Sequence, residues 1–189
     1  MKIRDLPVVA TIVVLAAVAT MIALGFWQLG RLQEKEAQLA IYFAAQNDNS
    51  EIAYPRDDAS LEAALYRRSR FECAQVTDII SVSGSSAKGG SGWAHKAECI
   101  LPDGSAGEAA LGWSRNPAAP EYTGGLVTGV IAPGGRLVAD PPLAGLEPLA
   151  KPDPADIPNN HLAYAGQWFF FAITALVIFF LAVRRRGKT

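Results

Sequence analysis

The chain has 189 residues, of which half are hydrophobic, and a formal net charge of −1 at pH 7. This composition would suit one globular domain, but the apolar residues are concentrated in two uncharged blocks near the ends, which argues against an ordinary water-soluble domain. The segment between the blocks is acidic overall, so the chain lacks the basic surface that is typical of nucleic-acid-binding proteins.

The first uncharged block covers residues 6–30, between Asp5 and Arg31. At about 1.5 Å rise per residue, a helix of this length spans roughly 37 Å and can cross a bilayer with some tilt. Lys2 and Arg4 also resemble the basic start of a signal peptide. The uncharged run is longer than the usual apolar part of such peptides, and it ends without their small-residue cleavage pattern. We therefore expect a retained membrane anchor.

Residues 31–50 continue the first block with strong helix formers. They predict a helical extension that projects beyond the membrane and ends near residues 47–50. Trp27 and Arg31 lie at the membrane exit, where aromatic and basic side chains are typical of ordinary anchoring at the interface.

The pattern changes to short strands over residues 51–139, after one short helix expected at residues 60–65. The strands are expected at residues 66–73, 76–82, 92–101, 107–114, 126–131 and 136–139. Short strands separated by Gly and Pro turns predict an antiparallel sheet or a small open barrel. The Gly/Ser-rich run 83–92 has no phosphate-binding pattern, so we expect a flexible hairpin loop.

This middle segment carries both cysteines, Cys73 and Cys99. An oxidising compartment would permit a disulfide between them, and two buried free thiols fit the sequence almost as well. His95 has no evident nucleophile as a partner, so we expect a surface histidine and no hydrolase or oxidoreductase activity. The cysteines and histidines do not have the spacing of a zinc site.

A dense basic cluster at Arg67, Arg68 and Arg70 interrupts the acidic middle segment. It could contact an anion, but a solvent-facing strand with one arginine on the opposite face is the simpler interpretation. We expect no nucleic-acid partner.

The second apolar block follows a proline-rich stretch, residues 140–160, which is expected to be an extended strap. Residues 161–183 contain no Asp, Glu, Lys or Arg, and their 23 residues have the length of a membrane-spanning helix. His161, Tyr164 and Trp168 lie three and four residues apart, so they share one face of that helix.

The distribution of charge predicts the topology. The tails 1–5 and 184–189 carry six Lys or Arg and one acid, a net charge of +5, whereas residues 31–160 carry eleven Lys or Arg and seventeen acids, a net charge of −6. By the positive-inside rule both tails lie in the cytoplasm and the middle faces the opposite side, the periplasm in a bacterium. The fold class is thus a membrane protein with two transmembrane α-helices flanking a small antiparallel β (α+β) periplasmic domain.

Two long motifs at opposite ends of the chain resemble the Surfeit locus protein 1 family. Residues 24–35 read LGFWQLGRLQEK, similar to the family pattern LGxWQxxRxxxK, and residues 158–169 read PNNHLAYAGQWF, similar to PxNHLxYAxxWF. In between, Tyr66-Arg67-Arg68 resembles a YRxV strand, and Leu111-Gly112-Trp113 stands where the family has RGW, with leucine replacing arginine.

The resemblance implies a non-catalytic factor in the bacterial inner membrane that assists assembly of haem-copper cytochrome c oxidase. The implied partners are subunit I of the oxidase, other assembly factors and membrane lipid, and the implied cofactor is haem a. His161 would be the candidate ligand of the haem iron. The remaining candidate residues would contact the macrocycle or its propionates, and they are Tyr164, Trp168, Trp27, Arg31 and Lys35. The alternative function is a structural accessory subunit or interaction module of a respiratory complex that handles no haem.

Overall fold

The computed structural model describes residues 8–186, and it forms two compact units. One unit combines the two ends of the chain, up to Gln38 and from Pro158, and the other spans Leu39–Ile157. The predicted tail 1–5 and residues 187–189 of the other tail lie outside the described residues.

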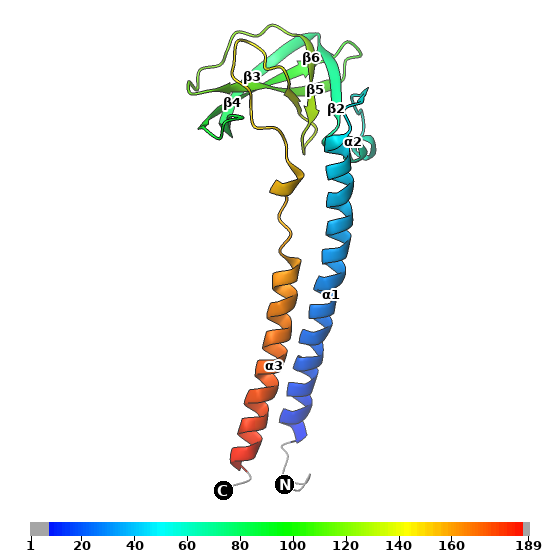
Figure 1. Ribbon diagram of the computed structural model, residues 1–189, viewed down its shortest axis with the longest axis vertical. Helices are drawn as coiled ribbons and strands as arrows, with labels where there is room; N and C mark the ends of the chain where they lie inside the picture. Colours follow the sequence, from blue (N-terminus) through cyan, green and yellow to red (C-terminus); the bar gives the residue numbers. More distant parts are fainter. Residues whose placement is uncertain (1–7, 187–189) are drawn as a thin grey trace. The chain divides into compact units, whose positions relative to one another are not determined.

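Two long helices account for the apolar blocks (Figure 1). Helix α1 covers Val8–Asn47 and helix α3 covers His161–Arg186, so the helical extension ends within the predicted range 47–50. Only 11% of the most apolar window of each helix is buried, unlike the core helix of a water-soluble protein. Both helices are therefore candidate membrane spans.

The second unit contains a seven-stranded sheet. The strands are β1 (Glu51–Ala53), β2 (Arg68–Cys73), β3 (Gln75–Ser85), β4 (Ser91–Ile100), β5 (Ala106–Ser114), β6 (Gly125–Ile131) and β7 (Leu137–Ala139). They lie side by side in the order β1-β2-β6-β7-β5-β4-β3. The six predicted strands are thus confirmed within a few residues. Strand β1 was missed because three residues give too short a pattern to recognise.

The prediction of a purely antiparallel sheet is wrong, because the sheet is mixed. β1 pairs with β2 in parallel, and β7 pairs in parallel with β5 while it pairs antiparallel with β6. The short β7 follows β6 through a tight turn and enters the sheet between β6 and β5. Strand direction relative to a non-sequential neighbour depends on the path of the whole chain, which local patterns do not encode.

The predicted flexible loop at residues 83–92 is mostly strand. β3 continues to Ser85 and β4 begins at Ser91, so only a short turn remains. That turn is closed by a 2.9 Å hydrogen bond from the Ser86 N–H to the Gly90 carbonyl, and Gly89 has a φ of 80°, which glycine adopts without strain.

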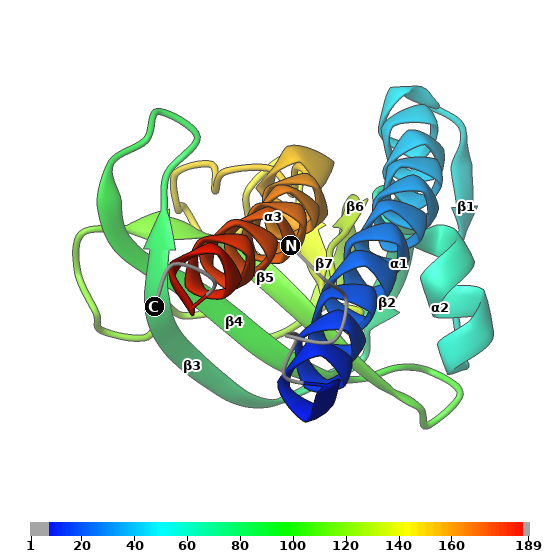
Figure 2. The same ribbon diagram turned by 90° about the horizontal axis from the view of Figure 1, so that it is seen from below.

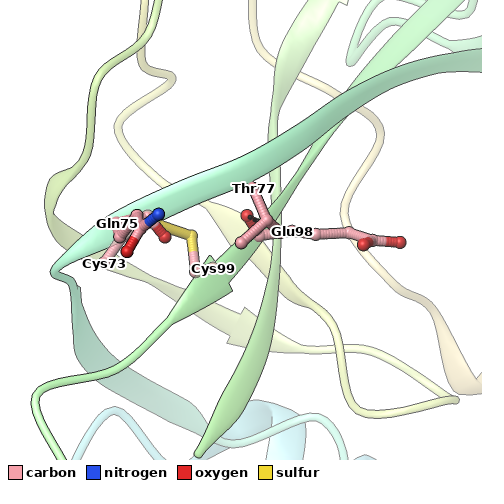
Figure 3. Close-up of a disulfide and its surroundings, with 5 residues drawn as sticks. All are labelled: Cys73, Gln75, Thr77, Glu98 and Cys99. Carbon is pink, nitrogen blue, oxygen red and sulfur yellow. Dashed lines mark hydrogen bonds between the residues drawn. A yellow bond between two sulfur atoms is a disulfide. The ribbon is translucent and has the colours of Figure 1, made fainter. Parts of the chain in front are cut away.

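The inward face of the sheet forms the core and carries the disulfide (Figure 3). Cys73 at the end of β2 is bonded to Cys99 near the end of β4, with sulfur atoms 2.05 Å apart. The bond joins strands that are not neighbours in the sheet. The prediction of a disulfide is confirmed, and the alternative of two free thiols is wrong.

The strap is extended, as predicted, apart from one 3-10 turn at Pro154–Asp156. It is anchored on β5, where Trp113 and Glu147 exchange hydrogen bonds of 2.7 and 3.0 Å between their backbones. A Cβ on Gly112 would lie 2.5 Å from the Cβ of Leu146, so glycine allows this close approach. The Gly112-Trp113 motif therefore holds the strap, and Leu111, in the place of the family's arginine, is fully buried in the core.

The prediction that His95 lies on the surface is wrong. It is fully buried, with Nδ1 2.9 Å from Ser81 Oγ and Nε2 2.8 Å from Ser114 Oγ. The alternation of β4 turns it inward, with Ala97 and Cys99, and the two serines satisfy both ring nitrogens. Burial lowers the pKa of His95 below its ordinary value, and contact with the Asn116 backbone partly opposes this effect.

The basic cluster lies toward solvent, and each arginine has an acidic partner. Arg67 pairs with Asp48 at 2.9 Å, Arg68 with Asp140 at 3.4 Å, and Arg70 with Glu51 at 2.8 Å. Arg68 and Arg70 alternate along β2 with the buried Ser69 and Phe71. These ion pairs support the simpler interpretation, in which the arginines belong to an ordinary polar surface.

Candidate functional site in the helix pair

The site lies where α1 and α3 pack together. The least exposed residues of α1 recur at alternating steps of three and four, and they include Thr11, Val14, Val18, Met21, Gly25, Gln28, Leu32 and Lys35. The corresponding row on α3 includes His161, Ala165, Trp168, Ala172, Ala175, Phe179 and Val183. A spacing that averages 3.5 residues is the spacing of a two-helix seam.

Glycine and alanine bring the two helices close together. A Cβ added to Gly25 would lie 2.5 Å from the ring of Phe169, and the same ring meets that of Phe26 edge to face, with centroids 5.5 Å apart. Ala165 and Ala172 are almost fully buried on the α3 side. Small residues at such positions allow close backbone approach, which is how helices associate in membranes.

His161 contacts α1 directly at the start of α3. Its Nδ1 lies 2.8 Å from Oε1 of Gln28, a residue 133 positions away in the chain. This contact brings the two sequence motifs together, since Gln28 belongs to the first motif and His161 to the second. The polar pair lies in a seam whose neighbouring positions, Gly25 and Ala165, are small and apolar.

The pair defines the chemistry of the imidazole. An amide oxygen only accepts hydrogen bonds, so Nδ1 of a neutral His161 donates its proton to Gln28. Nε2 then carries the free lone pair, which is the form in which imidazole binds a metal. Ligating histidines in metal sites typically donate their second nitrogen to such an acceptor, which fixes the tautomer and the ring orientation. His161 could therefore hold a metal ion through Nε2.

The three aromatic candidates differ in exposure. The Trp27 side chain is 57% exposed and that of Tyr164 is 51% exposed, so both lie mainly outside the seam. Trp168 lies in the seam and meets Phe171 edge to face, with centroids 6.3 Å apart. Trp168 is therefore held by packing, whereas Trp27 and Tyr164 present open apolar surface.

The two cationic candidates are already engaged with side chains of their own helix. Arg31 pairs with Glu34 one turn along α1, with about half of its side chain exposed. Lys35 Nζ donates to Oε1 of Gln38 at 3.0 Å. Either cation could give up its present partner and bind the carboxylate of another molecule, because such contacts contribute little to stability at a hydrated surface.

Sequence reasoning did not assign a role to Gln28, Gly25 or Asn159. Gln28 and Gly25 could have been found from the alternating spacing of the seam. Asn159 precedes His161 by two residues, and its Oδ1 is buried without a hydrogen-bond partner within residues 8–186. A buried acceptor of this kind is uncommon and is free to accept a hydrogen bond from a bound molecule.

Two comparisons with known proteins bear on identity. No curated protein matches the chain. The model of the SURF1 family matches residues 15–132, a range that holds the first motif and the sheet as far as β6. Because this match covers more than half of the sequence, the chain belongs to the SURF1 family, which is associated with cytochrome c oxidase assembly.

Proposed function

We propose that this chain is a non-catalytic, membrane-anchored assembly factor that assists the delivery of haem a to subunit I of cytochrome c oxidase. The family match supports a role in oxidase assembly. The observation that carries the haem proposal is the hydrogen bond between His161 and Gln28, since it leaves Nε2 of the imidazole as a metal-binding nitrogen.

In this proposal haem a is cargo, and His161 would hold its iron through Nε2 of the imidazole. Gln28 orients the ring and fixes its tautomer. Trp27, Tyr164 and Trp168 offer aromatic surface to the macrocycle. Arg31 and Lys35 offer charge to its propionates, after exchanging Glu34 and Gln38.

We also propose that the two helices span the inner membrane with both termini in the cytoplasm and the sheet in the periplasm. The charge difference between the tails and the middle segment supports this topology. The disulfide supports it independently, because such bonds persist in oxidising compartments. A periplasm-dependent reporter enzyme should be active when fused near residue 90 and inactive when fused at residue 189. The reverse pattern would contradict this orientation.

The function is tested by deleting the gene and measuring the haem a content and activity of the oxidase. Wild-type protein should restore both quantities, and His161→Ala should restore neither, although it should insert at the wild-type level. Leu162→Ala is the matched control, since this neighbouring side chain is exposed and takes no part in the site. Full restoration by His161→Ala would make the ligand assignment wrong.

Purified protein provides the second measurement. His161→Ala should abolish the haem absorption band, whereas Gln28→Leu should weaken haem binding on the order of 10- to 100-fold, the usual effect of removing the acceptor behind a ligating histidine. Arg31→Ala should have a smaller effect, because water can replace a partly hydrated propionate contact.

The geometry also favours a second candidate, a structural accessory subunit that handles no haem. A single polar pair in an apolar seam can fix the register of two helices, and the His161–Gln28 pair has this position. In that case His161→Ala would loosen the helix pair, and wild-type protein would show no haem band.

A further inference from the structure

The two edges of the sheet differ in how open they are. β1 forms one edge with only three residues, and Pro55, which lacks a backbone N–H, follows shortly after it. β3 forms the other edge with eleven residues, and it runs along the outside of the sheet beside β4 (Figure 2). Long edge strands normally carry charges, proline or a cover that prevents pairing with another chain.

The hydrogen bonds at the C-terminal end of β3 show which of its backbone groups point toward β4 and which point away from it. Ser86 N–H bonds to Gly90 on the β4 side, whereas the Ser85 carbonyl accepts from Ala150 N and Ala87 N–H donates to the Pro148 carbonyl, both at 2.9 Å. The backbone N–H and carbonyl groups of the odd-numbered residues of β3 therefore point away from β4. By this alternation Ile79, Ser81 and Ser83 direct their backbone groups to the free edge.

This free segment, residues 79–83, has definite limits. The strap covers the edge at Ser85 and Ala87, and a bulge between Val76 and Asp78 disturbs the other end. Within residues 8–186, no backbone group bonds to the outward side of residues 79–83, although Asp78 Oδ1 accepts the N–H of Ile79 at 2.8 Å. The segment contains no charged residue and no proline.

We propose that β3 pairs antiparallel with β3 of a second copy of this chain, about a two-fold axis through Ser81. The free segment is symmetric about that residue, so Ser81 faces Ser81 and Ile79 faces Ser83 of the second copy. Each facing pair exchanges two backbone hydrogen bonds. No other register places all three outward residues of both copies opposite one another.

The side chains and charges suit this register. Ile80, which is 38% exposed, lies opposite Val82 of the second copy, an apolar cross-strand pair. Asp78 lies opposite Gly84, so no like charges meet across the contact. In the dimer, the Ile79 N–H would leave the Asp78 carboxylate and donate to the Ser83 carbonyl of the second copy.

Cysteine cross-linking of the full-length protein in membranes tests the register. Both native cysteines are in the disulfide, so an introduced cysteine is the free thiol of the described chain. Ile80→Cys and Val82→Cys, carried by differently tagged copies in one cell, should give a cross-linked heterodimer under mild oxidation. Their Cα atoms would be about 4.5 Å apart, whereas identical positions lie on the diagonal at roughly 7–8 Å. No cross-link, or equal yield from Ile80→Cys alone, overturns the proposal.

Two substitutions with opposite effects test the hydrogen bonds, with the mass of the purified full-length protein in detergent as the readout. Ser83→Pro removes an N–H from the free edge and spares the bonds to β4, so it should weaken the dimer on the order of tenfold. Asp78→Ala releases the N–H of Ile79 and should strengthen the dimer. A protein that is monomeric at every concentration, or an Asp78→Ala variant with unchanged or weaker association, contradicts this contact.

Discussion

The two compact units of this chain are held together by different means. The β unit has a continuous apolar core, a disulfide between non-adjacent strands and a strap that is hydrogen-bonded to β5. The helix pair has a narrow seam of small residues, one polar pair and apolar outer faces that remain exposed. The β unit carries its own stabilisation, whereas the helix pair depends on its surroundings. The candidate site lies in the unit with fewer fixed contacts, and regions of this kind open more readily than a packed core.

The largest expected effect concerns the disulfide of the β unit. Replacing both Cys73 and Cys99 by serine releases a loop of 26 residues, and it should lower the free energy of unfolding by about 3.5 kcal/mol. Hydrogen exchange measured by mass spectrometry should show faster exchange throughout β2–β7 and unchanged exchange in α3. Equal loosening of α3 would mean that the two units are not independent.

The seam of the helix pair should respond to its glycine. Gly25→Val forces a side chain against the Phe169 ring and should destabilise the pair by about 1–3 kcal/mol. Gly30→Val is the matched control, since nothing lies within 4 Å of a Cβ there and the change in helix propensity is the same. Thermal unfolding in detergent measures both variants. Similar losses for the two would show that Gly25 matters only through propensity.

The β unit should lose stability in mild acid because of His95, its only histidine. Its pKa is lowered by burial, so the unfolded chain binds a proton that the folded chain does not. The stabilisation of the folded state by neutral His95 is complete above the ordinary pKa of 6.5. As the pH drops below this value, the free energy of unfolding falls by at most about 1.4 kcal/mol per pH unit. His95→Asn should flatten this dependence in denaturant titrations between pH 7 and 5. An equally steep dependence in the variant would assign it to other groups.

The smallest expected effect concerns the anchoring of β3. The indole N–H of Trp113 donates to the Gly84 carbonyl at 3.2 Å, across the position of Gly92 on β4. Trp113→Phe removes this hydrogen bond and should cost about 1 kcal/mol of unfolding free energy. The rate of backbone hydrogen exchange should rise near Gly84 and should not change in α1. A change confined to the strap would show that the Trp113 side chain acts on the strap and not on β3 through this bond.

The amino-acid sequence by itself determined the elements of this protein. Uncharged runs of 25 and 23 residues predict α1 and α3, and alternation between Gly and Pro turns predicts six of the seven strands. The two motifs also predicted the family, whose model matches residues 15–132. These signals are local, because helix and strand periodicities are read within a few neighbouring residues.

The tertiary structure alone decided how the elements combine. It placed β7 parallel to β5, turned His95 from the surface into the core, and joined His161 to Gln28 across 133 positions. It also left β3, and not β1, as the long free edge. Each of these outcomes depends on which distant segments meet, and this is set by the packing of the whole chain rather than by the preferences of any one segment.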